Sequence, residues 1–100
     1  MINECRFVGR LSTNAEERTF PSGDVVAVFR LIVPREEVGR VDTLDCRVEA
    51  AGVRKRVMAL ETGASIEVQG SLHRRFWRSA QGPASKYEVL VRSMRKVTME

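Results

Sequence analysis

The sequence predicts a small all-β domain with five strands and a single α-helix between the third and the fourth strand. Five segments alternate apolar and polar residues with the two-residue period of a β-strand. One further segment carries apolar residues at helical spacing, and polar or glycine- and proline-containing connections separate the elements. A chain of 100 residues is long enough for one domain with one core, so residues 1–100 are expected to fold as a unit.

The first three predicted strands precede the helix. They are residues 2–11, 24–33 and 42–49, and each places alternate apolar side chains on one face. Residues 12–18 are polar and are expected to form a loop, whereas residues 20–23, with the sequence Phe-Pro-Ser-Gly, favour a tight turn.

The predicted helix covers residues 50–62, and Gly63 is expected to end it. Its apolar stripe consists of Val53, Val57 and Leu60. The fourth strand follows Gly63 and continues to Trp77, and its inward positions are Ile66, Val68, Gly70 and Leu72. Residues 79–85 are expected to form a flexible hairpin tip before the last strand, residues 87–97, in which Tyr87, Val89, Val91 and Ser93 share one face.

This order of elements is that of an OB-fold, a five-stranded Greek-key barrel with one α-helix between strands 3 and 4. An unrelated α+β sheet with the same order of elements is the alternative. The hydrophobic share of 43% and the charged share of 30% are ordinary for a soluble globular domain.

Several classes of protein do not fit the composition. No apolar run is long enough to span a membrane, and the N-terminus lacks the apolar segment of a signal peptide. A cytoplasmic protein without membrane contact is therefore expected. Cys5 and Cys46 fit a reducing compartment and buried thiols better than a disulfide.

The end of the fourth strand combines basic and aromatic residues. Of the 17 basic residues in the chain 14 are arginine, the side chain that forks onto phosphate and stacks on flat rings. Residues 74–78, Arg-Arg-Phe-Trp-Arg, bring three of these arginines next to two rings. This composition suits single-stranded nucleic acid, because guanidinium groups meet phosphates and rings stack on bases. The other interpretation is a solvated basic tip on which Trp77 covers the core.

A second feature is an apolar set of side chains on positions that alternation directs away from the core. Its members are Val8 on the first strand and Val26, Val28 and Ile32 on the second strand. Exposure of four such side chains together would be costly, so they are expected to form the interface of a homo-oligomer. The first strand also contains no proline, which leaves an edge that a second copy could pair with.

Seven segments of the chain match one known family in the family's order: residues 7–11, 16–18, 21–23, 26–31, 44–46, 63–72 and 75–77. In these segments the chain resembles the DNA-binding domain of bacterial single-stranded DNA-binding proteins, so a nucleoid-associated location is expected. The resemblance implies an OB-fold, single-stranded DNA as the partner, a role in DNA replication, recombination or repair, and a homotetramer built as a dimer of dimers. It also places Trp77 where the family stacks a base, Arg75 where it contacts phosphate, and Arg30 on the strand face toward the bound DNA. With the remaining basic and aromatic candidates, the expected nucleic-acid-binding residues are Trp77, Arg75, Arg30, Arg74, Arg10, Arg47, Phe76 and Arg35.

Phe76 has the parity opposite to Trp77 and is more typical of a packing residue. The chain also departs from the family pattern. Glu49 stands where many members carry a stacking ring, and Thr43 stands where some carry a tryptophan. The connection at residues 34–41 offers arginines but no ring, and the acidic tail that recruits replication and repair proteins is not found before Glu100. These departures favour an alternative function, a tail-less OB-fold assembly module of the primosomal type that acts mainly through protein contacts.

Catalysis is not expected. The chain has one histidine, His73, and no recognisable nucleophile–base set, phosphate loop or zinc motif. Cys5, Cys46 and His73 lack the spacing of a metal site, so neither a metal nor a cofactor is expected.

Overall fold

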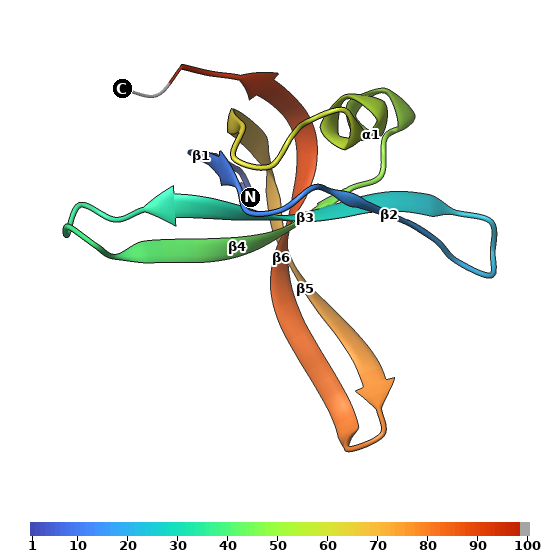
Figure 1. Cartoon of the computed structure of the whole chain (residues 1–100). Coiled ribbons are helices and arrows are strands. Elements are labelled where there is room, and N and C mark those ends of the chain that lie inside the picture. The colour runs from blue at the N-terminus through green and yellow to red at the C-terminus, as the bar shows by residue number, and fades with distance from the viewer. Residues whose placement is uncertain (99–100) are drawn as a thin grey trace.

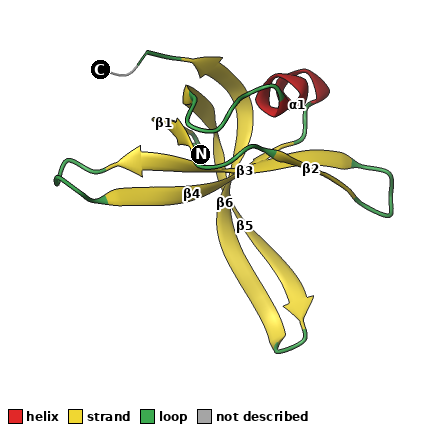
Figure 2. Ribbon diagram, in the orientation of Figure 1, coloured by secondary structure: helices red, strands yellow, loops and turns green. Residues whose placement is uncertain are grey.

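The computed structural model describes residues 1–98 and has six strands and one helix (Figures 1 and 2). The strands lie in the order β1-β5-β6-β4-β3-β2, and a further pairing of β1 with β3 closes five of them into a barrel. All pairings are antiparallel except that of β4 with β6. This is the OB-fold expected from the sequence, with the helix between β4 and β5. The elements are β1 (Cys5–Leu11), β2 (Glu16–Thr19), β3 (Val25–Pro34), β4 (Val41–Val48), α1 (Ala51–Met58), β5 (Ser65–Ser79) and β6 (Gly82–Lys96).

The alternating apolar residues of the barrel strands form the core. Strand β1 contributes Leu11 to this core and each of the other barrel strands contributes two or three buried side chains, while α1 adds Val57 and Leu60 follows just after it. The largest fully buried side chains are Leu11, Leu31, Ile66, Val48, Val57, Val68, Val89 and Cys46. Both cysteines are free thiols, as the sequence suggested. In residues 1–98 no helix is long and apolar enough to cross a membrane.

Strand β2, Glu16–Thr19, begins inside residues 12–18, which were expected to form only a loop, and ends directly before the expected turn at residues 20–23. Glu16–Thr19 pairs antiparallel with Val25–Val28 of β3, outside the closed barrel. All four residues of β2 are exposed. A strand with no buried face has no apolar alternation, so the sequence pattern could not reveal it.

The helix is shorter than predicted, because it ends at Met58 rather than at residue 62. Residues 59–64 form a turn, in which Leu60 reaches the core and Gly63 adopts a φ of 86°. The backbone N–H of Gly63 donates to the carbonyl of Leu11 at 2.9 Å, which ties this turn to the end of β1. Gly63 therefore ends the turn before β5 rather than the helix itself.

Beyond Gly70, the hairpin of β5 and β6 leaves the barrel as a projecting arm (Figure 1). Strand β1 stops pairing with β5 at Gly70, and only the side chain of Asn3 continues along that edge, through two hydrogen bonds to the backbone of Leu72. Leu72 was expected to point inward but is exposed, because it lies past the end of the barrel. The expected flexible tip at residues 79–85 is mostly paired strand, since β5 runs to Ser79 and β6 begins at Gly82.

A β-bulge changes which side chains of β6 point into the core. Gln69 pairs with Ser93 but its neighbour Gly70 pairs with Val91, so Arg92 is an extra residue in β6. Met94 is consequently buried and Ser93 exposed, whereas uninterrupted alternation predicted that Ser93 would share the face of Val91.

The four expected interface residues do not form one exposed patch. Val26 is only 3% exposed in the single chain, next to a hollow lined by Phe20 and Arg54, so its expected outward exposure is wrong. Val28 lines a cavity together with Arg30 on the outer side of β3. Val8 and Ile32 remain partly exposed, and their role in an interface stays a prediction.

The edge of β1 is the feature that still favours self-association. Within residues 1–98, β1 pairs with β3 only at Arg10 and Leu11, so the rest of this edge has no strand beside it. Glu67 lies opposite Val8 on β5 and is buried between Arg6 and Arg95, whose hydrogen bonds lower the pKa of its carboxyl. Two arginines share this one carboxylate, so the face beside the open edge keeps a net positive charge.

We propose that the protein self-associates at micromolar concentration through this edge and face, and we expect Val8→Asp to dissociate that oligomer, because it places a carboxylate in the proposed interface beside Glu67. Light scattering gives the mass, and a circular dichroism spectrum like that of the original protein shows that the variant still folds. Val38→Asp, on an exposed loop, is the control that should leave the mass unchanged. A monomeric mass for the unmodified protein at that concentration would contradict the interface.

Candidate nucleic-acid interface

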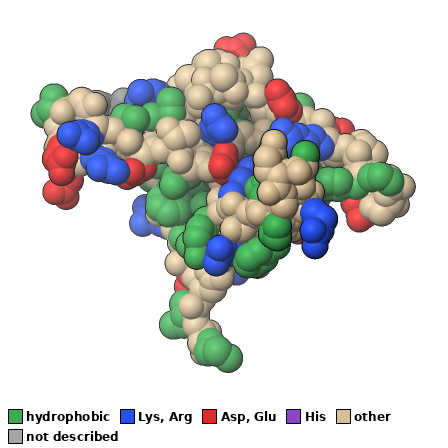
Figure 3. All heavy atoms as spheres, turned by 90° about the horizontal axis from the view of Figure 1, so that it is seen from below, with side chains coloured by type: hydrophobic (Ala, Val, Ile, Leu, Met, Phe, Trp, Pro, Cys, Tyr) green, Lys and Arg blue, Asp and Glu red, His purple; other side chains and the backbone are tan. Residues whose placement is uncertain are grey.

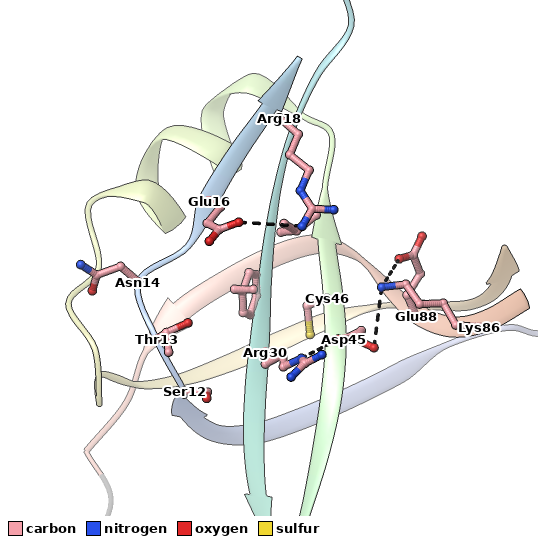
Figure 4. A pocket seen from close by; sticks show the side chains of 12 residues that line it. Ser12, Thr13, Asn14, Glu16, Arg18, Arg30, Asp45, Cys46, Lys86 and Glu88 are labelled. Atoms are coloured by element: carbon pink, nitrogen blue, oxygen red, sulfur yellow. Dashed lines mark hydrogen bonds and ion pairs between the residues drawn. The ribbon is translucent and has the colours of Figure 1, made fainter. Parts of the chain in front are cut away.

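A network of ion pairs runs across the outer side of β3, β4, β6 and β5, and Figure 4 shows the part of it between Arg30 and Glu88. It starts at Arg30 on β3, whose Nε donates to Asp45 on β4 at 3.1 Å. Lys86 on β6 lies 3.8 Å from Asp45 and 4.0 Å from Glu88. These contacts follow from the strand register, in which Arg30 pairs with Asp45. The network therefore joins residues that are up to 58 positions apart in the sequence (88 − 30).

Glu88 is the centre of the network. Its side chain is only 7% exposed, and its carboxylate accepts a hydrogen bond from the Nε of Arg75 at 3.2 Å. Arg47 lies 3.6 Å from the same carboxylate and 3.2 Å from Glu49. A nearly buried carboxylate that is shared by cations from three strands fixes where those cations sit.

Two aromatic rings flank the network. The guanidinium of Arg75 lies 4.8 Å from the centre of the Trp77 ring, which is 39% exposed. The guanidinium of Arg47 lies 5.6 Å from the ring of Phe20, at the turn between β2 and β3. Both are cation–π contacts, in which the flat guanidinium covers a ring face that a base could otherwise occupy.

Four of the eight expected site residues are thus brought together: Trp77, Arg75, Arg30 and Arg47. Arg74 and Phe76 lie on the opposite face of the β5–β6 hairpin, because alternate residues of a strand point to opposite sides. Phe76 was interpreted as a packing residue, but it is 68% exposed and that interpretation is wrong.

Arg35 and Arg10 lie away from these contacts. Arg35 is at the far end of the β3–β4 hairpin, where its Nη2 donates to Asp42 at 2.7 Å. This hydrogen bonding lowers the pKa of Asp42 and raises the pKa of Arg35. Arg10 is exposed on β1 and pairs with Ile32, two residues along β3 from Arg30.

Sequence reasoning missed Phe20 and two of the three carboxylates of the network, Asp45 and Glu88, whereas Glu49 was noted only as a departure from the family pattern. Phe20 was noted only as part of a turn, although an exposed ring next to a tight turn was a usable signal. No feature of the sequence pointed to Asp45 or Glu88, because the residues that they contact lie on other strands and only the register of those strands brings them together.

A cavity of about 280 Å³ lies beside Arg30, between the β1–β2 loop and strands β3, β4 and β6 (Figure 4). Its walls combine the hydroxyls of Ser12 and Thr13 with the charged groups of Arg18, Asp45 and Lys86. Cys46 lies at its base, and burial raises the pKa of this thiol to about 12. The thiol is therefore protonated near neutral pH, which makes it a poor nucleophile and metal ligand.

The described residues offer no arrangement for metal binding. In residues 1–98, no three His, Cys, Asp or Glu side chains gather where they could hold an ion. His73 is exposed and its Nε2 lies 2.8 Å from the hydroxyl of Ser71. The site is a surface of cations, carboxylates and aromatic rings, and such a surface suits the binding of a ligand.

The comparisons with known proteins agree with the fold described above. No curated protein matches the chain. Among solved structures, the single-stranded DNA-binding protein (SSB) of Plasmodium falciparum, in complex with single-stranded DNA, has a TM-score of 0.83 and 21% sequence identity, and the match covers 98% of this chain and 97% of that one. This similarity supports the fold. The model of the single-strand binding protein family matches residues 2–97, which is nearly the whole chain. The chain therefore belongs to the single-strand binding protein family.

Proposed function

We propose that this protein binds single-stranded DNA with little sequence preference, through arginine contacts to phosphates and stacking of bases on exposed rings. The observation that carries the proposal is the pair formed by Arg75 and Trp77 on the projecting hairpin, continuous with Lys86, Arg47 and Arg30. The relative from Plasmodium falciparum, which shares this fold, was solved with single-stranded DNA bound. A role in DNA replication, recombination or repair follows as part of the same proposal.

Binding would proceed by exchange of partners within the network. In the DNA-free protein each of the four cations already contacts a carboxylate, and Arg75 also covers Trp77. A base can replace the guanidinium over the ring while that guanidinium moves to a neighbouring phosphate. Every base has a flat face, so this exchange is tolerant of sequence.

The carboxylates reduce the affinity of this surface. The cations Arg30, Arg47, Arg75 and Lys86 face the acids Asp45, Glu49 and Glu88, which leaves a net charge of about +1 on the network (4 − 3). A phosphate must compete with a carboxylate for each guanidinium, and the negative charges of the three carboxylates repel the phosphate.

The same observation favours the second function, an OB-fold assembly module that acts mainly through protein contacts. A surface whose cations are already neutralised has less attraction for a polyanion. The unpaired edge of β1 also offers a place for another chain. The two functions differ in what the purified protein does alone.

Titration with oligothymidylate decides between them. Trp77 is the only tryptophan, so its emission reports this surface alone. If the protein binds single-stranded DNA, the oligonucleotide quenches the emission to saturation. Unchanged emission together with free oligonucleotide in a gel-shift assay would favour the assembly module.

Glu49 provides a further prediction. Because it stands at the end of the network beside Arg47, Glu49→Trp should tighten binding of oligothymidylate by roughly 1–3 kcal/mol through a new stack. Glu49→Gln removes only the charge and should give a smaller gain. Glu61→Trp, on the exposed turn after α1, is the matched control and should change nothing.

If Glu49→Trp binds no more tightly than the Glu61→Trp control, the DNA does not pass the end of β4. The assignment of Arg47 and Phe20 to the interface would then be withdrawn.

A further inference from the structure

The second face of the β5–β6 hairpin carries an exposed aromatic pair. We call it the Arg74 face, and its paired side chains from the barrel to the tip are Leu72, Arg74, Tyr87, Phe76, Ser85, Arg78 and Pro83. Phe76 is 68% exposed and Tyr87 is 61% exposed. Hydrophobic side chains with lysine and arginine beside them gather on the side of the molecule from which the hairpin projects (Figure 3).

One guanidinium lies against both rings. The centre of the Arg74 guanidinium is 4.8 Å from the ring of Phe76 and 5.6 Å from the ring of Tyr87. The Nε and Nη2 atoms of Arg74 donate to the hydroxyl of Ser85 at 3.2 and 3.0 Å. This arrangement follows from the register, since Arg74 pairs with Tyr87 and Phe76 pairs with Ser85.

The charge of this face differs from that of the network. On the Arg74 face, no acidic residue lies between Leu72 and Arg78 of β5 or among the residues of β6 that pair with them on the same face. In the part of the chain that the structure describes, Arg74 contacts a neutral hydroxyl, whereas Arg75 on the other side contacts Glu88. The cations of the Arg74 face are therefore available to an anion without displacement of a carboxylate.

We propose that the Arg74 face is a second binding surface for single-stranded DNA, on which bases stack on Phe76 and Tyr87 and phosphates contact Arg74 and Arg78. The inference rests on the proposed function and extends it to the opposite side of the hairpin. Single-stranded DNA matches the face in both respects, because it combines a polyanionic backbone with flat apolar groups. Two exposed rings that enclose an uncompensated arginine are complementary to that combination.

The shape of the hairpin allows both faces to act on one DNA strand. The arm projects from the barrel (Figure 1), and beyond Leu72 β5 pairs only with β6 in residues 1–98. A DNA strand with a base on Trp77 can continue across this open edge of β5 and reach Phe76, the residue next to Trp77 in the sequence. A short oligonucleotide would occupy the network alone, and a longer one would occupy both faces.

The chain supplies one natural reporter for each face. Trp77 is the only tryptophan and Tyr87 is the only tyrosine, and they lie on opposite faces of the hairpin. In a Trp77→Phe background the emission of Tyr87 can be recorded alone, while the phenyl ring keeps a stacking surface at position 77.

The test compares thymidylate oligonucleotides of about 6 and about 30 nucleotides, since one OB-fold binds about 4–16 nucleotides. We expect the Trp77→Phe protein to bind both, and only the longer one to quench Tyr87. The double variant Phe76→Ala with Tyr87→Ala should bind the short oligonucleotide as the original protein does and the long one at least tenfold more weakly. Val38→Ala, which truncates an exposed side chain on the β3–β4 loop, should leave both affinities unchanged.

Two results would overturn the second surface while leaving the proposed function intact. One is unchanged Tyr87 emission with the long oligonucleotide although it binds. The other is a double variant that binds both lengths normally, including the case in which it loses self-association and so shows that the face contacts protein. If the original protein binds neither length, the proposed function itself fails, and the second surface fails with it.

Discussion

Trp77→Ala is expected to weaken binding of oligothymidylate by roughly 1–3 kcal/mol, which is a factor of about 5–150. The reason is the loss of a partly exposed ring over which Arg75 already lies at 4.8 Å. The affinity can be measured by fluorescence anisotropy of a labelled oligonucleotide, so that the variant needs no tryptophan signal.

Trp77→Phe is the control, because it retains a ring and should recover much of the affinity. Equal affinities for the alanine variant and the original protein would show that no base stacks on Trp77. In that case binding would have to depend on the cations of the network alone.

Gly70→Ala is expected to lower the free energy of unfolding by roughly 3 kcal/mol or more. A Cβ atom at position 70 would lie 1.9 Å from the carbonyl oxygen of Leu90 and 2.8 Å from its carbonyl carbon, both backbone atoms. Relief of that clash requires separation of β5 from β6 at the bulge, where the hairpin leaves the barrel. Urea unfolding followed by circular dichroism gives the change.

Gly52→Ala is the matched control, since its Cβ would meet no atom within 4 Å and Gly52 lies in α1. Alanine is the better helix former, so this variant should be as stable as the original protein or up to about 1 kcal/mol more stable. A Gly70→Ala variant as stable as this control would contradict the close approach of the two strands.

The barrel could be predicted because most of its strands bury one face. Side chains such as Leu31, Val48 and Ile66 recur at a two-residue period that depends only on local sequence. The departures occur where that condition fails. Strand β2 buries no face, the extra residue Arg92 shifts the period of β6, and Leu72 keeps the period although the barrel has ended.

The arginines and the tryptophan of the candidate site were predictable from the sequence, but Lys86 and the contacts among the residues of the site were not. Arg75 and Trp77 lie two residues apart on one strand, so the sequence alone shows that they share a face. The contacts of Arg47 and Arg75 with Glu88 join three strands, and only the register of those strands brings the groups together. The same is true of Arg74 and Tyr87, which are 13 residues apart and directly paired (87 − 74).

The network also explains how a family member with fewer rings can keep an ordered surface. Glu88 and Asp45 hold the arginines in place without DNA, at the cost of competition with phosphate. The affinity of this protein should therefore depend on salt as well as on the stacking of a base on Trp77.

The most direct test of the account is the affinity for oligothymidylate at two or more salt concentrations, for the original protein and for Arg75→Ala. If arginines hold phosphates, the logarithm of the association constant falls linearly with the logarithm of salt, by about 0.7 per phosphate contact. We expect such a slope for the original protein and a slope shallower by about 0.7 for Arg75→Ala. An affinity that does not change with salt, or equal slopes for the two proteins, would contradict it.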